Sequence, residues 1–163
     1  MATELLSIDQ LLSNTAEPKR EFRWIISLNG IDAYTARSSA LPSGSFGETD
    51  IQFINSIRYL SGKYKPDDWT LKLWDPIAPS ESQKVMEWVR LNYEVISGRM
   101  GYADFYKKDL DIKLLDPPGG VASQWTLKGA WVKKADFGKL DYTSDNLIEI
   151  DLTIRYDTAV LIF

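Results

Sequence analysis

The chain of 163 residues contains no cysteine and no histidine. Without cysteine there is no disulfide framework, no thiolate nucleophile and no zinc–thiolate site. Without histidine there is no catalytic triad or dyad with an imidazole base, and no imidazole-ligated metal. An enzyme made from this chain would have to use Asp, Glu, Lys, Tyr or Ser alone. We therefore expect a protein that is not an enzyme and that needs no cofactor.

Basic charge and long apolar runs are also scarce. The 19 Lys and Arg residues stand against 23 Asp and Glu, a formal net charge of −4, whereas electrostatic capture of nucleic acid needs a basic face. No run of about 18 apolar residues occurs, so we expect no membrane insertion by this chain. The first twelve residues contain Glu4 and Asp9, unlike a secretory signal, which predicts folding in a reducing cytoplasm.

What is present fits one globular domain with an N-terminal arm. Hydrophobic residues make up 44% of the chain and charged residues 26%, as in ordinary globular domains, and the length suits a single core. We expect a separable arm over residues 1–18 and a single domain over 19–163. Apolar residues recur along the arm at roughly helical spacing: Leu5, Leu6, Ile8, Leu11 and Leu12. The arm either docks on its own domain or reaches a neighbouring subunit.

Alternation of apolar and polar residues with a period of two predicts most of the domain to be strands. The alternating apolar sets are Phe22 to Leu28, Trp69 to Leu73, Leu110 to Leu114, Trp125 to Trp131 and Ile148 to Tyr156. Asn29-Gly30 after the first set is a strong hairpin signal, because both positions tolerate positive φ. It predicts a return strand over residues 31–37.

Residues 46–64 predict a long hairpin of unusually low hydrophobicity. Glu48, Asp50 and Gln52 share one face of its first strand, and Thr49, Ile51 and Phe53 share the other. Long strands with little core content expose edges that invite pairing with other chains. Here that pairing is a candidate function.

One long helix is predicted among the strands. Ser80 and Gln83 form a capping-box pattern, and Gly98 stands where a C-terminal glycine cap belongs. Between them, Val85, Trp88, Val89 and Ile96 lie on one face. A single helix among many antiparallel strands predicts an α+β fold.

Motifs for chemistry are absent or weak. There is no glycine-rich phosphate loop. Asp67 and Asp68 suit either a metal or glycosidase site or a turn that leads into a strand, and we favour the turn because adjacent carboxylates rarely converge. Asp141, Asp145 and Glu149 lack calcium-loop spacing. Trp131 near Lys133 and Lys134 is the one weak candidate for base stacking; the tryptophans are expected to be core residues.

Several motifs, taken in their order along the chain, resemble those of the tail tube proteins of contractile-tailed bacteriophages. This family also includes the inner tubes of related contractile injection machines. The resemblance runs from about residue 22 to residue 156. It is carried by Trp88 and by residues 40–44 (ALPSG), 67–70 (DDWT), 128–131 (KGAW), 138–140 (GKL) and the last strand, 148–157. No single motif is specific, but their order and spacing together are.

The resemblance implies a mostly antiparallel α+β fold: a small β-barrel or sandwich with one flanking helix and long hairpins that extend into a ring-forming sheet. It implies a structural virion protein that forms hexameric rings, and these rings stack into a tube for DNA ejection. The tube would be assembled in the host cytoplasm and would be part of the virion tail. Two hairpins would line the bore, residues 46–64 and, as a second, residues around 110–133. The alternative is an inner tube subunit of a protein-injection or secretion machine; a hydrolase that uses carboxylates alone is a third possibility.

The implied partners are further copies of the chain, the tail sheath protein, and the baseplate and tail-terminator proteins. A tape measure protein and DNA would pass through the lumen without sequence-specific binding. Under this interpretation Glu48, Asp50 and Gln52 face the lumen, where negative charge repels DNA. Contacts between subunits are expected from apolar residues near the two ends of the chain: Leu11, Leu12, Leu161 and Phe163.

Overall fold

The computed structural model describes residues 17–28 and 30–163. The strands are β1 (Trp24–Leu28), β2 (Ala36–Ser39), β3 (Gly44–Phe53), β4 (Ser56–Pro66), β5 (Trp69–Trp74), β6 (Lys108–Leu115), β7 (Val121–Asp136), β8 (Glu149–Arg155) and β9 (Thr158–Leu161). The helices are a 3-10 turn, η1 (Ala33–Thr35), the main helix α2 (Glu81–Asn92) and the short α3 (Ala103–Tyr106).

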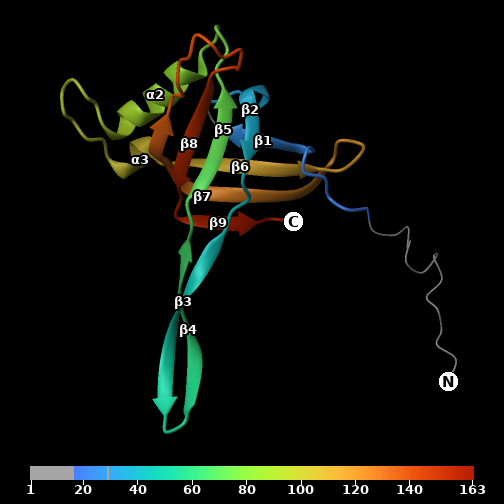
Figure 1. The fold of residues 1–163 in the computed structure, drawn as a ribbon, viewed down its shortest axis with the longest axis vertical. Coiled ribbons are helices and arrows are strands. Elements are labelled where there is room, and N and C mark those ends of the chain that lie inside the picture. The colour runs from blue at the N-terminus through green and yellow to red at the C-terminus, as the bar shows by residue number, and fades with distance from the viewer. Residues whose placement is uncertain (1–16, 29) are drawn as a thin grey trace, which may run out of the picture.

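Seven strands form one antiparallel sheet that folds over into two layers. The strand order is β1-β6-β7-β8-β5-β2, and β9 pairs with β7. The first part of β7 pairs with β6 and β9, and its second part pairs with β8, so β6, β7 and β9 run across β5 and β8 (Figure 1). The predicted mostly antiparallel α+β fold is confirmed. The sheet is not closed into a barrel, because within the described residues its order ends at β1 and β2, which do not pair with each other.

The long strand β7 changes layers at a bulge around Gly129. Leu127 pairs with Leu110, but Ala130 pairs with Lys108, so β7 carries one extra residue here. Gly129 has φ +66°, and Leu127 and Ala130 are both fully buried. The predicted alternation from Trp125 through Trp131 is therefore wrong beyond Leu127, because the bulge shifts the inward face by one residue.

The core lies between the two layers and beneath α2. Its fully buried side chains come mainly from the alternating positions predicted for β5, β6 and β8: Trp69, Leu71, Leu73, Leu110, Ile112, Ile150, Leu152 and Ile154. Trp69 and Trp88 are buried and donate their indole N–H groups to the carbonyls of Ala40 and Tyr106, both at 2.6 Å. Their polar atoms are thus satisfied inside the core.

The main helix is shorter than predicted and is capped by a residue outside the capping box. Ser80 is the N-cap but makes no side-chain capping bond. Asp75 instead accepts the backbone N–H groups of Glu81 at 2.8 Å and Ser82 at 3.3 Å. The helix ends at Asn92, so Gly98 does not cap it, and Ile96 lies exposed in the following loop.

The predicted hairpin at Asn29-Gly30 is also wrong. Leu28 and Ile31 form a single bridge, after which the chain turns through η1. Strand β2 then pairs with β5 and not with β1. The Asn29-Gly30 pattern is a local turn signal, but it does not determine which strand the chain pairs with afterwards. Here that strand, β5, belongs to the other layer.

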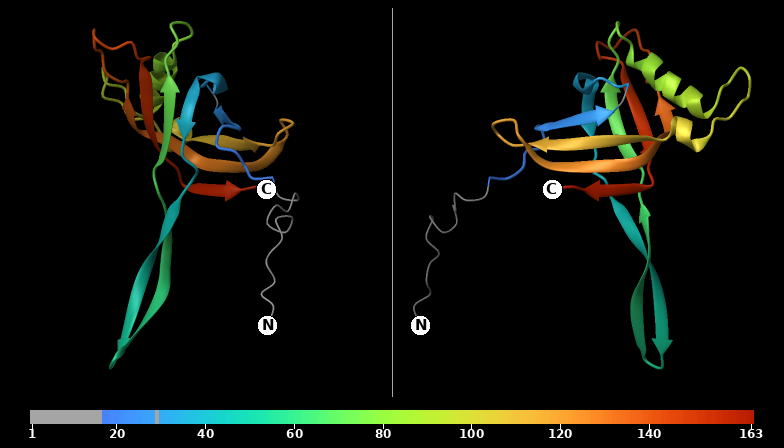
Figure 2. Two further views of the ribbon diagram at one scale, coloured as in Figure 1. Left: turned by 45° about the vertical axis from the view of Figure 1, so that its right-hand side comes forward. Right: turned by 180° about the vertical axis from the view of Figure 1, so that it is seen from behind.

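The hairpin predicted over residues 46–64 is confirmed and projects from the body. Strands β3 and β4 form a two-stranded sheet of their own, which extends away from the two layers along the long axis of the molecule (Figures 1 and 2). Every residue of β3 is exposed, and so is every residue of β4 except Pro66. This hairpin is therefore the first candidate for an assembly surface.

Candidate assembly surfaces

The register of the hairpin sorts its side chains onto two faces, because directly opposed residues of antiparallel strands share a face. Glu48 lies opposite Ser61, Asp50 opposite Tyr59 and Gln52 opposite Ile57. We call this set of six residues the acidic face. Gln52 donates a hydrogen bond from Nε2 to Oδ2 of Asp50 at 3.2 Å. The three residues predicted to line a lumen are thus brought together on one exposed surface.

The opposite surface of the hairpin, the apolar face, carries no carboxylate, whereas the acidic face combines Glu48 and Asp50 with the exposed Ile57 and Tyr59. Its opposed pairs are Thr49 with Leu60, Ile51 with Arg58 and Phe53 with Ser56. Ile51, Phe53 and Leu60 are all solvent-exposed in the single subunit, Phe53 by 71%. The outer edges of β3 and β4 have no partner strand among the described residues. Exposed apolar side chains beside open strand edges are typical of a surface that other chains cover.

The base of the hairpin is fixed to the body. Tyr156, which is buried directly after the last residue of β8, donates a hydrogen bond to the carbonyl of Ser43 at 2.9 Å, and burial raises the pKa of its hydroxyl. The backbone N–H of Asp67 donates to the same carbonyl at 3.0 Å. Beside this anchor, the rings of Phe46 and Tyr64 pack with centroids 5.1 Å apart. The hairpin therefore leaves the body in a defined direction.

The neighbouring carboxylates Asp67 and Asp68 do not form a site. Asp68 binds Nζ of Lys133 at 2.6 Å and Nη1 of Arg155 at 2.8 Å, and these two hydrogen bonds hold its pKa below the usual value. Asp67 instead accepts the hydroxyl of Ser43 at 3.2 Å. The turn interpretation holds, and Lys133 is engaged in an ion pair and not in a base-stacking platform.

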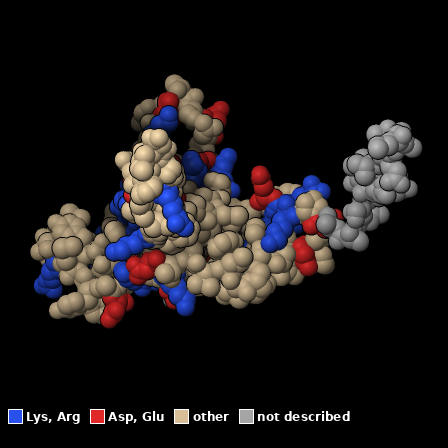
Figure 3. Space-filling model, turned by 90° about the horizontal axis from the view of Figure 1, so that it is seen from below, with Lys and Arg blue, Asp and Glu red and all other residues tan. Residues whose placement is uncertain are grey.

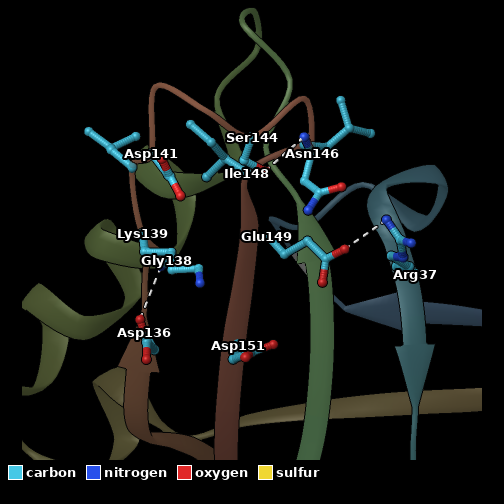
Figure 4. Close-up of a pocket in the computed structure, with 12 residues that line it drawn as sticks. Arg37, Asp136, Gly138, Lys139, Asp141, Ser144, Asn146, Ile148, Glu149 and Asp151 are labelled. Carbon is cyan, nitrogen blue, oxygen red and sulfur yellow. Dashed lines mark hydrogen bonds and ion pairs between the residues drawn. The ribbon is translucent and has the colours of Figure 1, made fainter.

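A cavity of about 730 Å³ lies at the other end of the molecule, under the loop 137–148 (Figure 4). We call it the loop cavity. Its apolar lining comes from Leu140, Leu147 and Ile148. The charged lining comes from four carboxylates and two cations: Asp136, Asp141, Glu149, Asp151, Arg37 and Lys139. Strand and loop segments far apart in the sequence build this cavity, so no local motif indicates it.

Two interactions order the rim of the loop cavity. Arg37 Nη1 and Glu149 Oε1 form an ion pair of 2.7 Å that joins β2 and β8, the two strands that flank β5 in the sheet. Asp141 accepts the backbone N–H of Thr143 at 2.9 Å and its hydroxyl at 2.8 Å, and these bonds lower the pKa of Asp141. The loop carries a fixed negative charge at its tip.

Of the contact residues predicted near the two ends of the chain, the structure describes only those near the C-terminus. Leu11 and Leu12 lie outside the described residues. Near the C-terminus, Ile162 donates its N–H to the carbonyl of Gln124 at 2.8 Å, which continues the pairing of β9 with β7. This pairing holds Leu161 and Phe163 in place while about half of each side chain stays exposed. They remain available for a contact with another subunit.

Features of other functional classes are missing from the described part of the chain. In residues 17–28 and 30–163, no three His, Cys, Asp or Glu side chains gather to hold a metal ion. No helix in these ranges has the length and apolar character needed to cross a membrane. Seen from the hairpin end, the charged residues of both signs are interspersed over a mostly uncharged surface (Figure 3).

A two-layer antiparallel body with a projecting, open-edged hairpin is typical of a subunit that assembles with other chains. Comparison with known proteins agrees. Residues 45–159 match the family described as T4-like virus tail tube protein gp19. The tail tube protein gp19 of Enterobacteria phage T4 is 23% identical over 129 residues, which cover 76% of this chain and 78% of the T4 protein.

Solved structures share the fold at low sequence identity. The tube-terminating cap of the anti-feeding prophage superposes with a TM-score of 0.73 at 19% identity, over 90% of this chain and 92% of that one. A sheath–tube complex of an extracellular contractile injection system gives 0.63 at 16% identity, over 95% and 97%. Hcp1 from Flavobacterium johnsoniae gives 0.51 at 15% identity, over 86% and 94%.

The chain belongs to the T4-like virus tail tube protein family. It is a structural tail tube protein and not an enzyme, as the sequence predicts.

Proposed function

We propose that the protein forms hexameric rings that stack into the tail tube of a virion and conduct DNA during ejection. The observation that carries this proposal is the projecting hairpin, whose two edges are open and whose two faces differ in chemistry. In a closed ring, the edges of β3 and β4 pair with strands of neighbouring subunits, which removes the exposed backbone groups. The paired strands β6 and β7 contribute the second bore-lining hairpin, around residues 110–133.

The orientation of the hairpin follows from its faces. The apolar face, with Ile51, Phe53 and Leu60, packs outward against the bodies of neighbouring subunits, where burial of apolar area stabilises the ring. The acidic face then points into the lumen, with Glu48, Asp50 and Gln52 exposed to the cargo. Twelve carboxylates per hexameric ring, two from each subunit, would repel the phosphate backbone and keep DNA from adhering.

The partners follow from the same role. Solved relatives include a tube-terminating cap, a sheath–tube complex and a baseplate refined with 6-fold symmetry. We propose a sheath protein around the tube, a baseplate at one end and a terminator at the other. A tape measure protein occupies the lumen before DNA, and assembly takes place in the host cytoplasm.

A second candidate function is the inner tube of a machine that injects protein. The structural likeness to the cap of the anti-feeding prophage favours it, whereas the sequence relationship to the phage T4 tail tube favours DNA cargo. Sequencing the neighbouring genes separates the two: capsid and portal genes support the first, and a cluster of effector genes supports the second.

The lumen assignment is tested by reversing charge on the acidic face. Glu48→Lys with Asp50→Lys should leave rings and tubes intact by electron microscopy but slow the release of DNA from particles, because the bore now attracts phosphate. The matched control is Glu94→Lys with Asp104→Lys, an equal charge change at exposed sites near α2 and α3. Unchanged release by the hairpin variant would contradict the assignment.

A further inference from the structure

A groove lies at the side of the body where the sheet is left open. It has a volume of about 520 Å³ and is lined by β1 and β6 from one layer and by β2 from the other. The outer edges of β1 and β2 pair with no strand of the described residues (Figure 1). We call this feature the open-edge groove. Open strand edges beside a groove are typical of a surface that another chain segment covers.

The lining of the open-edge groove is mainly apolar. Ile112 forms the floor and is 2% exposed, whereas Phe22 and Leu41 at the rim are 74% and 51% exposed. Trp24 and Leu114 are half-buried. An apolar segment laid along the groove would cover the exposed rim and gain the free energy of burying it.

One segment of this chain has the composition to fill the groove. It is the arm over residues 5–12, which lies outside the described residues. The charged side chains among residues 1–14 are both negative, Glu4 and Asp9. The segment is otherwise rich in aliphatic residues, namely Leu5, Leu6, Ile8, Leu11 and Leu12. The arm is therefore both apolar and acidic.

The chain beside the groove carries the opposite charge. Residues 19–23 (KREFR), which we call the basic root, have three cations against one carboxylate. Glu21 and Phe22 of this root line the groove, and the guanidinium of Arg23 lies 5.2 Å from the centre of the Phe22 ring. An acidic, apolar arm is thus complementary to the groove in both charge and hydrophobicity.

The direction of the chain before β1 favours the groove of another copy over the chain's own groove. Residues 17–22 are all exposed and run outward from the body (Figure 1). Because each arm starts beside its own groove, the distance to a second copy's groove equals the spacing between the two copies. A folded body of this size is about 40 Å wide. Residues 5–12 precede Phe22 by 10 to 17 positions, a reach of up to about 33–56 Å, so they can span this spacing.

We propose that residues 5–12 of one subunit bind in the open-edge groove of a second copy in the tube. This inference rests on the proposed stacked-ring function, and it names the surface that receives the arm. A contact between two different surfaces of identical chains is heterologous, so it repeats from copy to copy. The exchanged arms would link each subunit to the next and cover apolar area that the single subunit leaves exposed.

The absence of cysteine allows a cross-linking test. One variant carries Ile8→Cys in the arm, and another carries Ser38→Cys, an exposed position that lines the groove. The two are mixed, assembled into tubes and treated with a short bis-maleimide linker. We expect a dimer band on a denaturing gel that is at least tenfold stronger in the mixture than in either variant alone. A chain with both substitutions should give a ladder of higher species.

The matched control uses Ser97→Cys in place of Ser38→Cys, an equal change at an exposed site in the loop after α2. Assembled tubes whose cross-link between positions 8 and 38 is no stronger than this control would overturn the docking and leave the tail tube function standing. A doubly substituted chain that forms an internal link and no ladder would place the arm in its own groove, which also overturns the proposal. Wild-type protein that forms no rings or tubes would overturn both proposals.

A second set of variants tests whether the arm and the groove act on each other. Phe22→Asp places a carboxylate at the rim, where it repels the acidic arm, and the exposure of this site means that the melting temperature of the subunit should not change. The yield of sedimented tubes should fall at least fivefold relative to Ile96→Asp, which is 93% exposed in the loop after α2. Adding Phe22→Asp to a variant with Leu11→Ser and Leu12→Ser should cause no further loss, because residues that share one contact are not additive. Losses that multiply, or a Phe22→Asp yield equal to that of the control, would refute the proposal.

Discussion

At the scale of single residues, Gly129 shows how one position lets β7 serve both layers. A Cβ atom at this position would lie 2.2 Å from Oδ2 of Asp157, and φ is +66°. Asp157 also binds Nζ of Lys107 at 2.8 Å. Gly129→Ala should therefore lower the free energy of unfolding by about 1–3 kcal/mol, through backbone strain and displacement of this ion pair. Urea denaturation followed by circular dichroism measures the change.

The control for that substitution is Gly47→Ala in the hairpin. Its backbone does not have positive φ, and the nearest atom to an added Cβ is 3.9 Å away. This variant should unfold like the wild type. Equal stability of the two variants would show that the bulge does not require glycine.

At the scale of elements, Asp75 decides where α2 begins. Its carboxylate accepts the N–H groups of Glu81 and Ser82 and the hydroxyl of Ser80 at 3.2 Å, with the Ser82 hydroxyl as a further donor. Burial alone would raise the pKa of Asp75, but these hydrogen bonds outweigh it and hold the pKa below the ordinary 3.8. Asp75→Ala should cost about 1–2 kcal/mol at neutral pH, as loss of a helix cap does.

The pH dependence of this contribution has a defined sign. Because the folded pKa of Asp75 is depressed, its stabilisation is complete above the unfolded pKa and is lost as pH falls through the folded value. The difference in unfolding free energy between wild type and Asp75→Ala should shrink as the pH falls from about 5 to below 3. Glu94→Ala, in the exposed loop after α2, controls for general charge loss. A difference that stays constant over this range would contradict the capping role.

The same scale shows what the sequence could and could not predict. Period-two alternation located β5, β6 and β8 and the projecting hairpin, because burial on one face leaves a local pattern. It could not identify Asp75 as a cap, since that residue precedes the helix by six positions and reaches it through tertiary folding. The Asn29-Gly30 turn signal predicted the wrong pairing for the chain after Leu28, because β2 finds its partner β5 some thirty residues later.

At the scale of the whole molecule, the alternation of Glu48, Asp50 and Gln52 predicted which side chains share a hairpin face. The loop cavity could not be predicted, because its lining joins β2, the end of β7, the loop 137–148 and β8. Such a surface exists only after the layers have folded. The interfaces of a tube are even harder to predict from local sequence, since they join segments of different copies of the chain.

The last prediction concerns residues 1–14, which either reach a neighbouring subunit or dock on their own domain. In the part of the chain that the structure describes, fifteen buried residues between Ile26 and Tyr156 form the hydrophobic core, and the strands β1 to β9 pair with one another. We expect a domain with this core to fold without residues 1–14, so that their deletion leaves the melting temperature nearly unchanged. It should impair polymerisation, because Leu11 and Leu12 are then missing from the contact with a neighbouring subunit.

Circular dichroism gives the melting temperature, and sedimentation with negative-stain microscopy gives the yield and length of tubes. The matched control deletes residues 1–3 only and keeps the apolar series from Leu5 to Leu12. If the longer deletion forms tubes like the control, the arm takes no part in assembly. If it instead lowers the melting temperature by several degrees, the arm docks on its own domain, since each kcal/mol of lost stability costs about 2–4 °C in a domain of this size.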